Sequence, residues 1–114
     1  MDISKNFRQL GLETFQENLS SAMAFFPWRP SLMRDRLDSA YVFLLAFSFR
    51  RHNGPFPTPS FLRNLDGIAQ TMKDAAHEIE KRPPTAAPQE LAKKLRQDAA
   101  TISNFVQGYR PQPL

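Results

Sequence analysis

The ten prolines of this chain fall in clusters that divide it into proline-free segments. Proline lacks a backbone N–H and its ring clashes with the preceding turn, so it is excluded from helix interiors and tolerated only in a first turn. Prolines stand at positions 27 and 30, between 55 and 59, between 83 and 88, and at 111 and 113. Any long helix must therefore lie between these clusters. The sequence predicts four such helical segments and shows no internal repeat.

The clearest helix is predicted between Pro59 and Arg82. Apolar side chains recur there at steps of three and four residues, and polar side chains fall opposite them, as in an amphipathic helix. The apolar members are Phe61, Leu65, Ile68, Ala69, Met72, Ala76 and Ile79. Thr58 or Ser60 is suited to cap the start of this helix, and the prolines at 83 and 84 prevent its continuation past Arg82.

The last helix is predicted to begin near Pro88 and to end at Gly108, because glycine is favoured just after a helix C-terminus. Its apolar stripe consists of Leu91, Leu95, Ala99, Ile102 and Val106, with Phe105 beside it. Residues 109–114 follow and contain two prolines. We therefore expect them to form a short flexible tail.

The first helical segment, from Ile3 to Phe26, is predicted to be broken at Gly11. One apolar stripe precedes the glycine and another follows it, and the two lie roughly 130° apart on a helix that turns about 100° per residue. The stripes are Ile3, Phe7 and Leu10, and then Phe15, Leu19, Ala22 and Phe26. Glycine costs about 1 kcal/mol relative to alanine inside a helix, so a short helix followed by a break explains the shift better than one straight rod.

The second segment, from Ser31 to Arg51, ends in a basic cluster. The cluster is Arg50, Arg51 and His52, and Asn53, Gly54 and Pro55 follow it. Positive charge is favoured at the C-terminal end of a helix dipole, and asparagine or glycine adopts the left-handed conformation that commonly ends a helix. A helix stop therefore accounts for the position of the cluster, although the same residues also present positive charge.

Apolar side chains surround this second segment between Ala40 and Phe47, whereas an outer helix of a small bundle usually keeps a polar face. A buried strand is the rival interpretation, because the run is rich in strand-forming residues, but a strand without a partner elsewhere in the chain is implausible. The helical interpretation predicts an apolar patch that points away from the core. Its members are Tyr41, Val42, Leu45 and Phe49.

We predict an all-α fold, a small four-helix bundle with a broken first helix and short linkers that contain proline and glycine. A chain of 114 residues has the size of one domain, which we place at residues 1–108. The linkers are expected around 27–30, 54–58 and 83–87. The predicted core consists of Phe15, Leu19, Leu37, Phe43, Leu44, Phe47, Phe61, Leu65, Ile68, Met72, Ile79, Leu91, Leu95, Ile102 and Val106.

Catalysis has little support in the sequence, and we expect no enzyme, no cofactor and no metal site. The chain has no cysteine, which excludes thiolate chemistry and cysteine-based metal centres. Asp74, His77 and Glu78 share one helix face, but solvated charges are normal on such a face. The four glycines stand apart, so no glycine-rich phosphate loop is present, and no serine nucleophile motif occurs.

Positive charge is concentrated around the second segment. Residues 29–63 carry six arginines against two aspartates, and the whole chain has a net charge of +4. Arginine binds phosphate through its planar fork of donors, so nucleic-acid binding is an alternative function, although no recognition-helix or RNA-binding signature accompanies the charge. The candidate residues for this alternative are Arg34, Arg36, Arg50, Arg51, Arg63, Lys93, Lys94 and Arg96.

The leading hypothesis is a non-enzymatic interaction protein: an adaptor, inhibitor, chaperone or assembly subunit that binds a protein partner through helix surfaces. Tryptophan and arginine are common interface anchors, which adds two residues of the first loop to the apolar patch. The candidate partner-binding residues are Trp28, Arg29, Tyr41, Val42, Leu45 and Phe49. A homodimer or larger symmetric assembly is expected to cover the patch, and a short N-terminal helix folded over it is the alternative.

The compartment is predicted from what the sequence lacks. Its longest apolar run, from Ala40 to Phe47, is far below the roughly 20 residues needed to span a bilayer, so no membrane partner is expected. The N-terminal residues include acidic side chains and no unbroken apolar run, unlike a secretory signal. Together with the absence of cysteine, these features predict a cytoplasmic protein.

Overall fold

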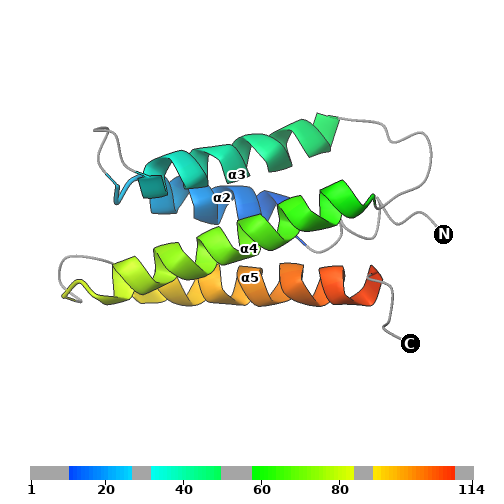
Figure 1. Cartoon of the computed structure of the whole chain (residues 1–114). Coiled ribbons are helices and arrows are strands. Elements are labelled where there is room, and N and C mark those ends of the chain that lie inside the picture. Colours follow the sequence, from blue (N-terminus) through cyan, green and yellow to red (C-terminus); the bar gives the residue numbers. More distant parts are fainter. Residues whose placement is uncertain (1–10, 27–31, 50–57, 84–88, 110–114) are drawn as a thin grey trace.

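The computed structural model describes residues 11–26, 32–49, 58–83 and 89–109, and these residues contain four helices (Figure 1). The helices are α2 (Leu12–Met23), α3 (Leu32–Phe49), α4 (Pro59–Glu80) and α5 (Gln89–Tyr109). No strand occurs within the described ranges, and residues 40–47 lie inside α3. The predicted all-α four-helix bundle is confirmed, and the strand interpretation of residues 40–47 is excluded.

Consecutive helices run in opposite directions, so α2 and α4 begin at the end of the bundle where α3 and α5 finish (Figure 1). The most extensive packing is between α4 and α5 and between α2 and α3, while smaller contacts join α2 to α5 and α3 to α4. The bundle is therefore built from two antiparallel helix pairs, as short linkers favour.

Helix α4 begins and ends where local chemistry predicts. Thr58 is its N-cap: the Phe61 backbone N–H donates a 3.1 Å hydrogen bond to the Thr58 hydroxyl oxygen, and Pro59 occupies the first turn. The helix ends at Glu80, and the Arg82 N–H donates to the Ile79 carbonyl in a final turn before Pro83. The sequence had left Thr58 and Ser60 as alternative caps, and the structure selects Thr58.

Helix α2 begins directly after Gly11, which has φ 113° and ψ 45°. This left-handed conformation is readily available to glycine and costs other residues roughly 1–2 kcal/mol, and it interrupts a regular helix at this position. The break predicted at Gly11 is confirmed on the α2 side. Residues 3–10, predicted to form the short helix before the break, lie outside the described residues.

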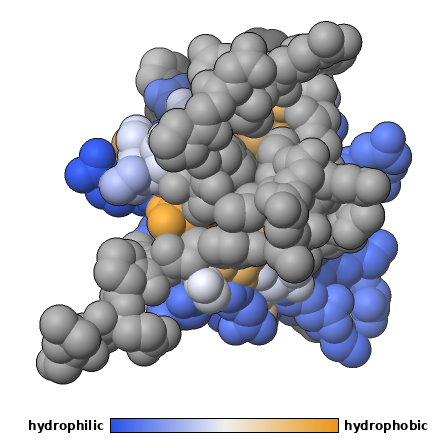
Figure 2. Space-filling view, turned by 90° about the vertical axis from the view of Figure 1, so that its right-hand side faces the viewer, coloured by the Kyte–Doolittle hydropathy of each residue, from blue (hydrophilic) through white to orange (hydrophobic). Residues whose placement is uncertain are grey.

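The core runs along the whole bundle and is contributed by all four helices. Every predicted core residue is buried except Phe43, which is half-buried and packs against the core from its edge. The Phe61 ring joins the helix pairs, with ring centroids 5.7 Å from Phe43 and 5.2 Å from Phe47. Viewed along the bundle, hydrophilic residues gather at the periphery and smaller hydrophobic patches lie nearer the centre (Figure 2).

One predicted boundary differs from the structure by one residue. Helix α5 continues through Gly108 to Tyr109, because Gly108 does not adopt the positive φ of the predicted cap. Helix α3 is described to Phe49, and the predicted helix end at Arg51 lies outside the described residues. The remaining tail, 110–114, and most of the predicted linkers lie outside the described residues.

Candidate functional site

Helix α3 has one face in the core and an apolar face in solvent. Leu37, Ala40, Leu44 and Phe47 are buried, as their spacing predicts for a core stripe. On the opposite side Val42 keeps 53% and Leu45 keeps 37% of its surface exposed. We call the helix positions Asp35, Asp38, Val42, Leu45 and Phe49 the α3 outer face; the Phe49 side chain lies outside the description.

Tyr41 and Phe43 border the α3 outer face on its two sides, and both are half-buried. Tyr41 borders a polar hollow of ≈ 690 Å³ whose other walls come from α2: Glu13, Gln16, Glu17, Ser20 and Ser21. The sequence predicts Tyr41 on the outside and Phe43 in the core. Both instead occupy intermediate positions, because neighbouring helices cover only part of each ring.

A groove of ≈ 520 Å³ lies between α3 and α4, on the Phe43 side of α3. Its apolar lining comes from Ala40, Phe43 and Ile68, and Gly67 opens it further, since a Cβ at that position would meet no atom within 4 Å. The polar lining is provided by Asp35, Arg36, Ser39, Asn64, Gln70 and Thr71. The groove therefore combines an apolar strip with hydrogen-bonding groups along its sides.

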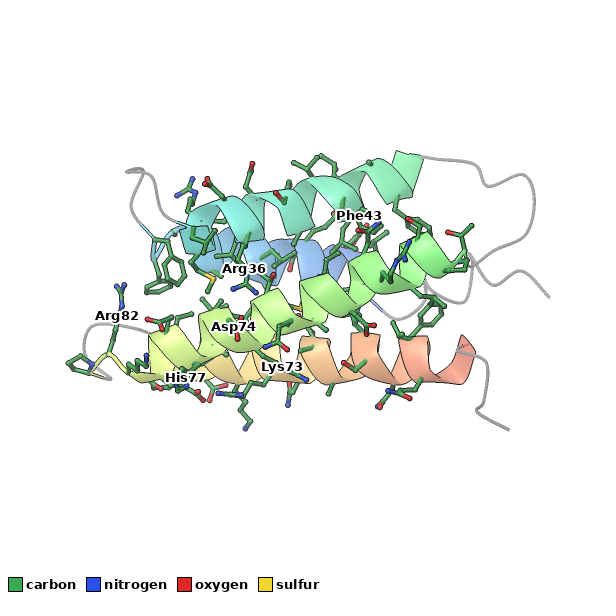
Figure 3. The ribbon with its side chains drawn as sticks, viewed as in Figure 1. Arg36, Phe43, Lys73, Asp74, His77 and Arg82 are labelled. Atoms are coloured by element: carbon green, nitrogen blue, oxygen red, sulfur yellow. The ribbon has the colours of Figure 1, made fainter. Side chains whose placement is uncertain are left out.

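Arg36 and Asp74 join α3 to α4 beside this groove (Figure 3). The Arg36 Nη2 donates to Asp74 Oδ2 at 2.8 Å, and Gln70 donates to the other carboxylate oxygen at 2.9 Å. The bond from Arg36, followed by that from Gln70, lowers the pKa of the Asp74 carboxyl. Arg36, a candidate phosphate contact in the sequence, thus has a protein partner in the bundle.

Arg34 also contacts protein groups. Its Nη1 donates hydrogen bonds of 3.0 Å to the main-chain carbonyls of Met23 and Phe26, at the end of α2. The Met23 carbonyl also accepts a 3.2 Å hydrogen bond from the Phe26 N–H, so Arg34 adds a second donor there and a donor to the Phe26 carbonyl just beyond the helix. Arg82 closes the same end from α4, with its guanidinium 5.8 Å from the centre of the Phe26 ring.

The other predicted cationic residues are divided between helices. Arg96 donates from Nε to both carboxylate oxygens of Glu80 at 3.2 and 3.1 Å, and its Nη2 also donates to Glu80 Oε1, which lowers the pKa of Glu80. Arg63 lies exposed on α4, and Lys93 and Lys94 lie exposed on α5. Four predicted site residues, Trp28, Arg29, Arg50 and Arg51, lie outside the described residues.

The described helices carry no positive excess. The described residues contain nine of the fifteen lysine and arginine residues but ten of the eleven acidic residues. The net charge of +4 therefore originates in the chain outside the described residues, at Lys5, Arg8, Arg29, Arg50, Arg51 and Arg110.

A buried polar pair that sequence reasoning missed joins α2 to α5. Asn18 and Asp98 are each 8% exposed, and Asn18 Nδ2 donates to Asp98 Oδ2 at 2.6 Å. Burial raises the pKa of the Asp98 carboxyl, while the bond from Asn18 and the charge of Lys94 oppose that rise. The only sequence signal was the position of each residue beside an apolar stripe.

Comparison with models of protein families, with curated proteins and with solved structures gave no match to this chain.

Within the described residues, no three histidine, cysteine, aspartate or glutamate side chains are grouped so that they could hold a metal ion. His77 is exposed on α4 near Asp74 and Glu78. No described helix is both long and apolar enough to cross a membrane. The α3 outer face and the adjoining groove are the features best suited to contact another molecule.

Proposed function

We propose that this chain is a non-enzymatic cytoplasmic interaction protein that binds another protein through the α3 outer face. The observation that carries the proposal is the exposure of Val42 and Leu45 on a helix whose opposite face is buried. Removing apolar surface from water is favourable, and contiguous apolar surface on a small protein commonly marks a contact site. A protein partner supplies the matching apolar side chains.

The groove between α3 and α4 supports the same proposal. Phe43, Ala40 and Ile68 provide half-buried or buried apolar side chains in this groove, on the same helix as or next to the helix of the outer face. Side chains with hydrogen-bonding groups, among them Asn64 and Gln70, border the apolar strip. An apolar centre with a polar rim is typical of protein interfaces.

Phosphate binding has weaker support than protein binding. Three of its candidate arginines, Arg34, Arg36 and Arg96, already donate hydrogen bonds within the bundle. Releasing them for phosphate would remove those bonds, and the described helices offer no positive excess to attract a polyanion. We therefore expect retention on nucleic acid to be weak and to disappear at moderate salt.

The proposal is tested by affinity capture with three forms of the chain. Wild type, Val42→Glu/Leu45→Glu and Ala100→Glu/Gln107→Glu are immobilised and exposed to nuclease-treated extract of the native cells at moderate salt. The second pair is the matched control, because it adds the same charge at exposed positions of α5. We expect at least one protein to be retained by wild type and the control and lost from the α3 variant.

A retained protein is then purified and titrated against the three forms by calorimetry. The proposal predicts a dissociation constant at least tenfold weaker for Val42→Glu/Leu45→Glu, with helical circular dichroism unchanged. Identical sets of captured proteins on all three surfaces would contradict it. Proteins that are retained by the wild type only when nuclease is omitted would instead favour the nucleic-acid alternative.

A further inference from the structure

We infer that the protein partner of the α3 outer face is a second copy of this chain, and that the two α3 helices pack antiparallel. The inference rests on the proposed function, because it names the occupant of the same face. A contact between identical surfaces must be complementary to itself under a two-fold rotation. The spacing and the charge of the α3 outer face meet this condition.

The spacing is that of a two-helix seam. Asp35, Asp38, Val42, Leu45 and Phe49 follow one another at alternating steps of three and four residues. Two helices that pack along each other use this heptad spacing, because it keeps one row of side chains at the contact. In the first half of α3 this row is acidic, and in the second half it is apolar.

Charge selects the direction of packing. In a parallel pair, Asp35 and Asp38 would each face the same aspartate of the second copy, and both are exposed in the single chain. Like charges that face each other are destabilising. An antiparallel pair separates the acidic halves. It also brings Asp35 and Asp38 of each copy toward the C-terminal end of α3 in the other copy. In the sequence, Arg50 and Arg51 follow directly after that end.

The apolar residues select the register. When Val42 faces Leu45 of the second copy, residues 38–49 of both helices overlap, Val42 and Leu45 meet in the middle, and Asp38 lies opposite position 49 at each edge. A shift of one heptad toward the N-terminus would instead place Asp38 opposite Val42 and Asp35 opposite Leu45, so that every facing pair joins an aspartate to an apolar side chain. The opposite shift would leave only residues 45–49 of the two helices in contact. The first register therefore buries the most apolar surface of the described helix.

A contact through one helix from each copy is small. It covers less than the roughly 800 Å² per partner of a standard stable interface, so the dimer is expected to be weak. Sedimentation velocity should therefore span roughly 10 to 500 µM protein, where weak association becomes measurable. We expect the weight-average mass to rise from the 13.1 kDa monomer toward twice that value over this range.

The same series is recorded for the two glutamate variants defined above. Val42→Glu/Leu45→Glu is expected to stay monomeric throughout, and Ala100→Glu/Gln107→Glu to follow wild type. A wild-type mass that does not change with concentration would overturn the inference. So would an unchanged dimer in the α3 variant, since another face would then form the contact.

Cysteine cross-linking tests the direction of the helices, because the chain has no cysteine of its own. Val42 lies next to the proposed two-fold axis, so Val42→Cys should form a disulfide-linked dimer under mild oxidation. In the proposed register the two copies of residue 35 lie about 25 Å apart, well beyond disulfide reach, so Asp35→Cys should not cross-link. Efficient linking of Asp35→Cys would show a parallel pair and overturn the inference.

Failure of this inference is distinguishable from failure of the proposed function. If wild type stays monomeric but a different purified protein binds it and not Val42→Glu/Leu45→Glu, the second copy is ruled out as the partner and the proposed function stands. If wild type stays monomeric and no protein depends on Val42 and Leu45 for binding, both are overturned.

Discussion

The side-chain amide of Asn18 donates a 2.6 Å hydrogen bond to the carboxylate of Asp98, and both side chains are buried between α2 and α5. A carboxylate removed from water loses hydration, and one amide hydrogen bond replaces only part of it. The pKa of Asp98 is accordingly raised from its ordinary value of 3.8, with burial as the largest cause. This pair links stability to pH.

Asp98→Asn is expected to raise the free energy of unfolding at neutral pH, on the order of 1 kcal/mol. Because the folded protein holds the Asp98 proton to higher pH than the unfolded chain, the contribution of Asp98 to stability is greatest below pH 3.8 and falls as pH rises through the raised pKa. Urea unfolding of both proteins should show a stability difference that grows from pH 3 toward neutrality. A variant less stable than wild type at every pH would mean that the carboxylate is net stabilising.

Arg34→Met is expected to lower the free energy of unfolding by about 1–3 kcal/mol, because two part-buried carbonyl groups at the end of α2 lose a charged donor. Arg63→Met is the control, since it removes the same charge from an exposed position of α4 and should change stability by less than about 0.5 kcal/mol. Chemical denaturation measures both variants. Equal effects would show that the bonds from Arg34 contribute nothing particular to stability.

Two glycine-to-alanine changes should have opposite effects on stability. Gly11→Ala forces a side chain into the left-handed conformation and should destabilise by about 1–2 kcal/mol. Gly67→Ala lies inside α4 with no atom near its added Cβ and should stabilise by up to about 1 kcal/mol through helix propensity. Thermal unfolding followed by circular dichroism compares them. A stabilised Gly11→Ala variant would contradict the φ of 113° at this position.

The Arg36 and Asp74 ion pair should contribute little and should depend on salt. A double-mutant cycle with Arg36→Met and Asp74→Asn is expected to give a coupling free energy of about 0.2–1 kcal/mol that declines at high ionic strength, because both side chains remain partly exposed. A coupling that does not change with salt would indicate a desolvated pair instead.

The sequence by itself determined where the helices lie and which side of most of them is buried. The Thr58-Pro59 start of α4, the break at Gly11 and the stripes through Phe15, Leu65 and Leu95 depend on interactions within a few residues along the chain. Such local preferences can be deduced without knowing the neighbouring helices. The exposed apolar residues Val42 and Leu45 were predicted for the same reason, since a core stripe on one face leaves the opposite face outside.

Only the tertiary structure decided which polar groups meet. Arg34 contacts α2, Arg36 contacts α4, Arg96 contacts α4, and Asn18 meets Asp98 across the bundle. Each contact depends on how two helices are rotated and shifted against each other, which residue spacing within one helix does not specify. The same rotation left Phe43 half-buried at the edge between α3 and α4, although its helical position alone suggested the core. Local chemistry therefore sets the helices, and their mutual packing sets the surface available for binding.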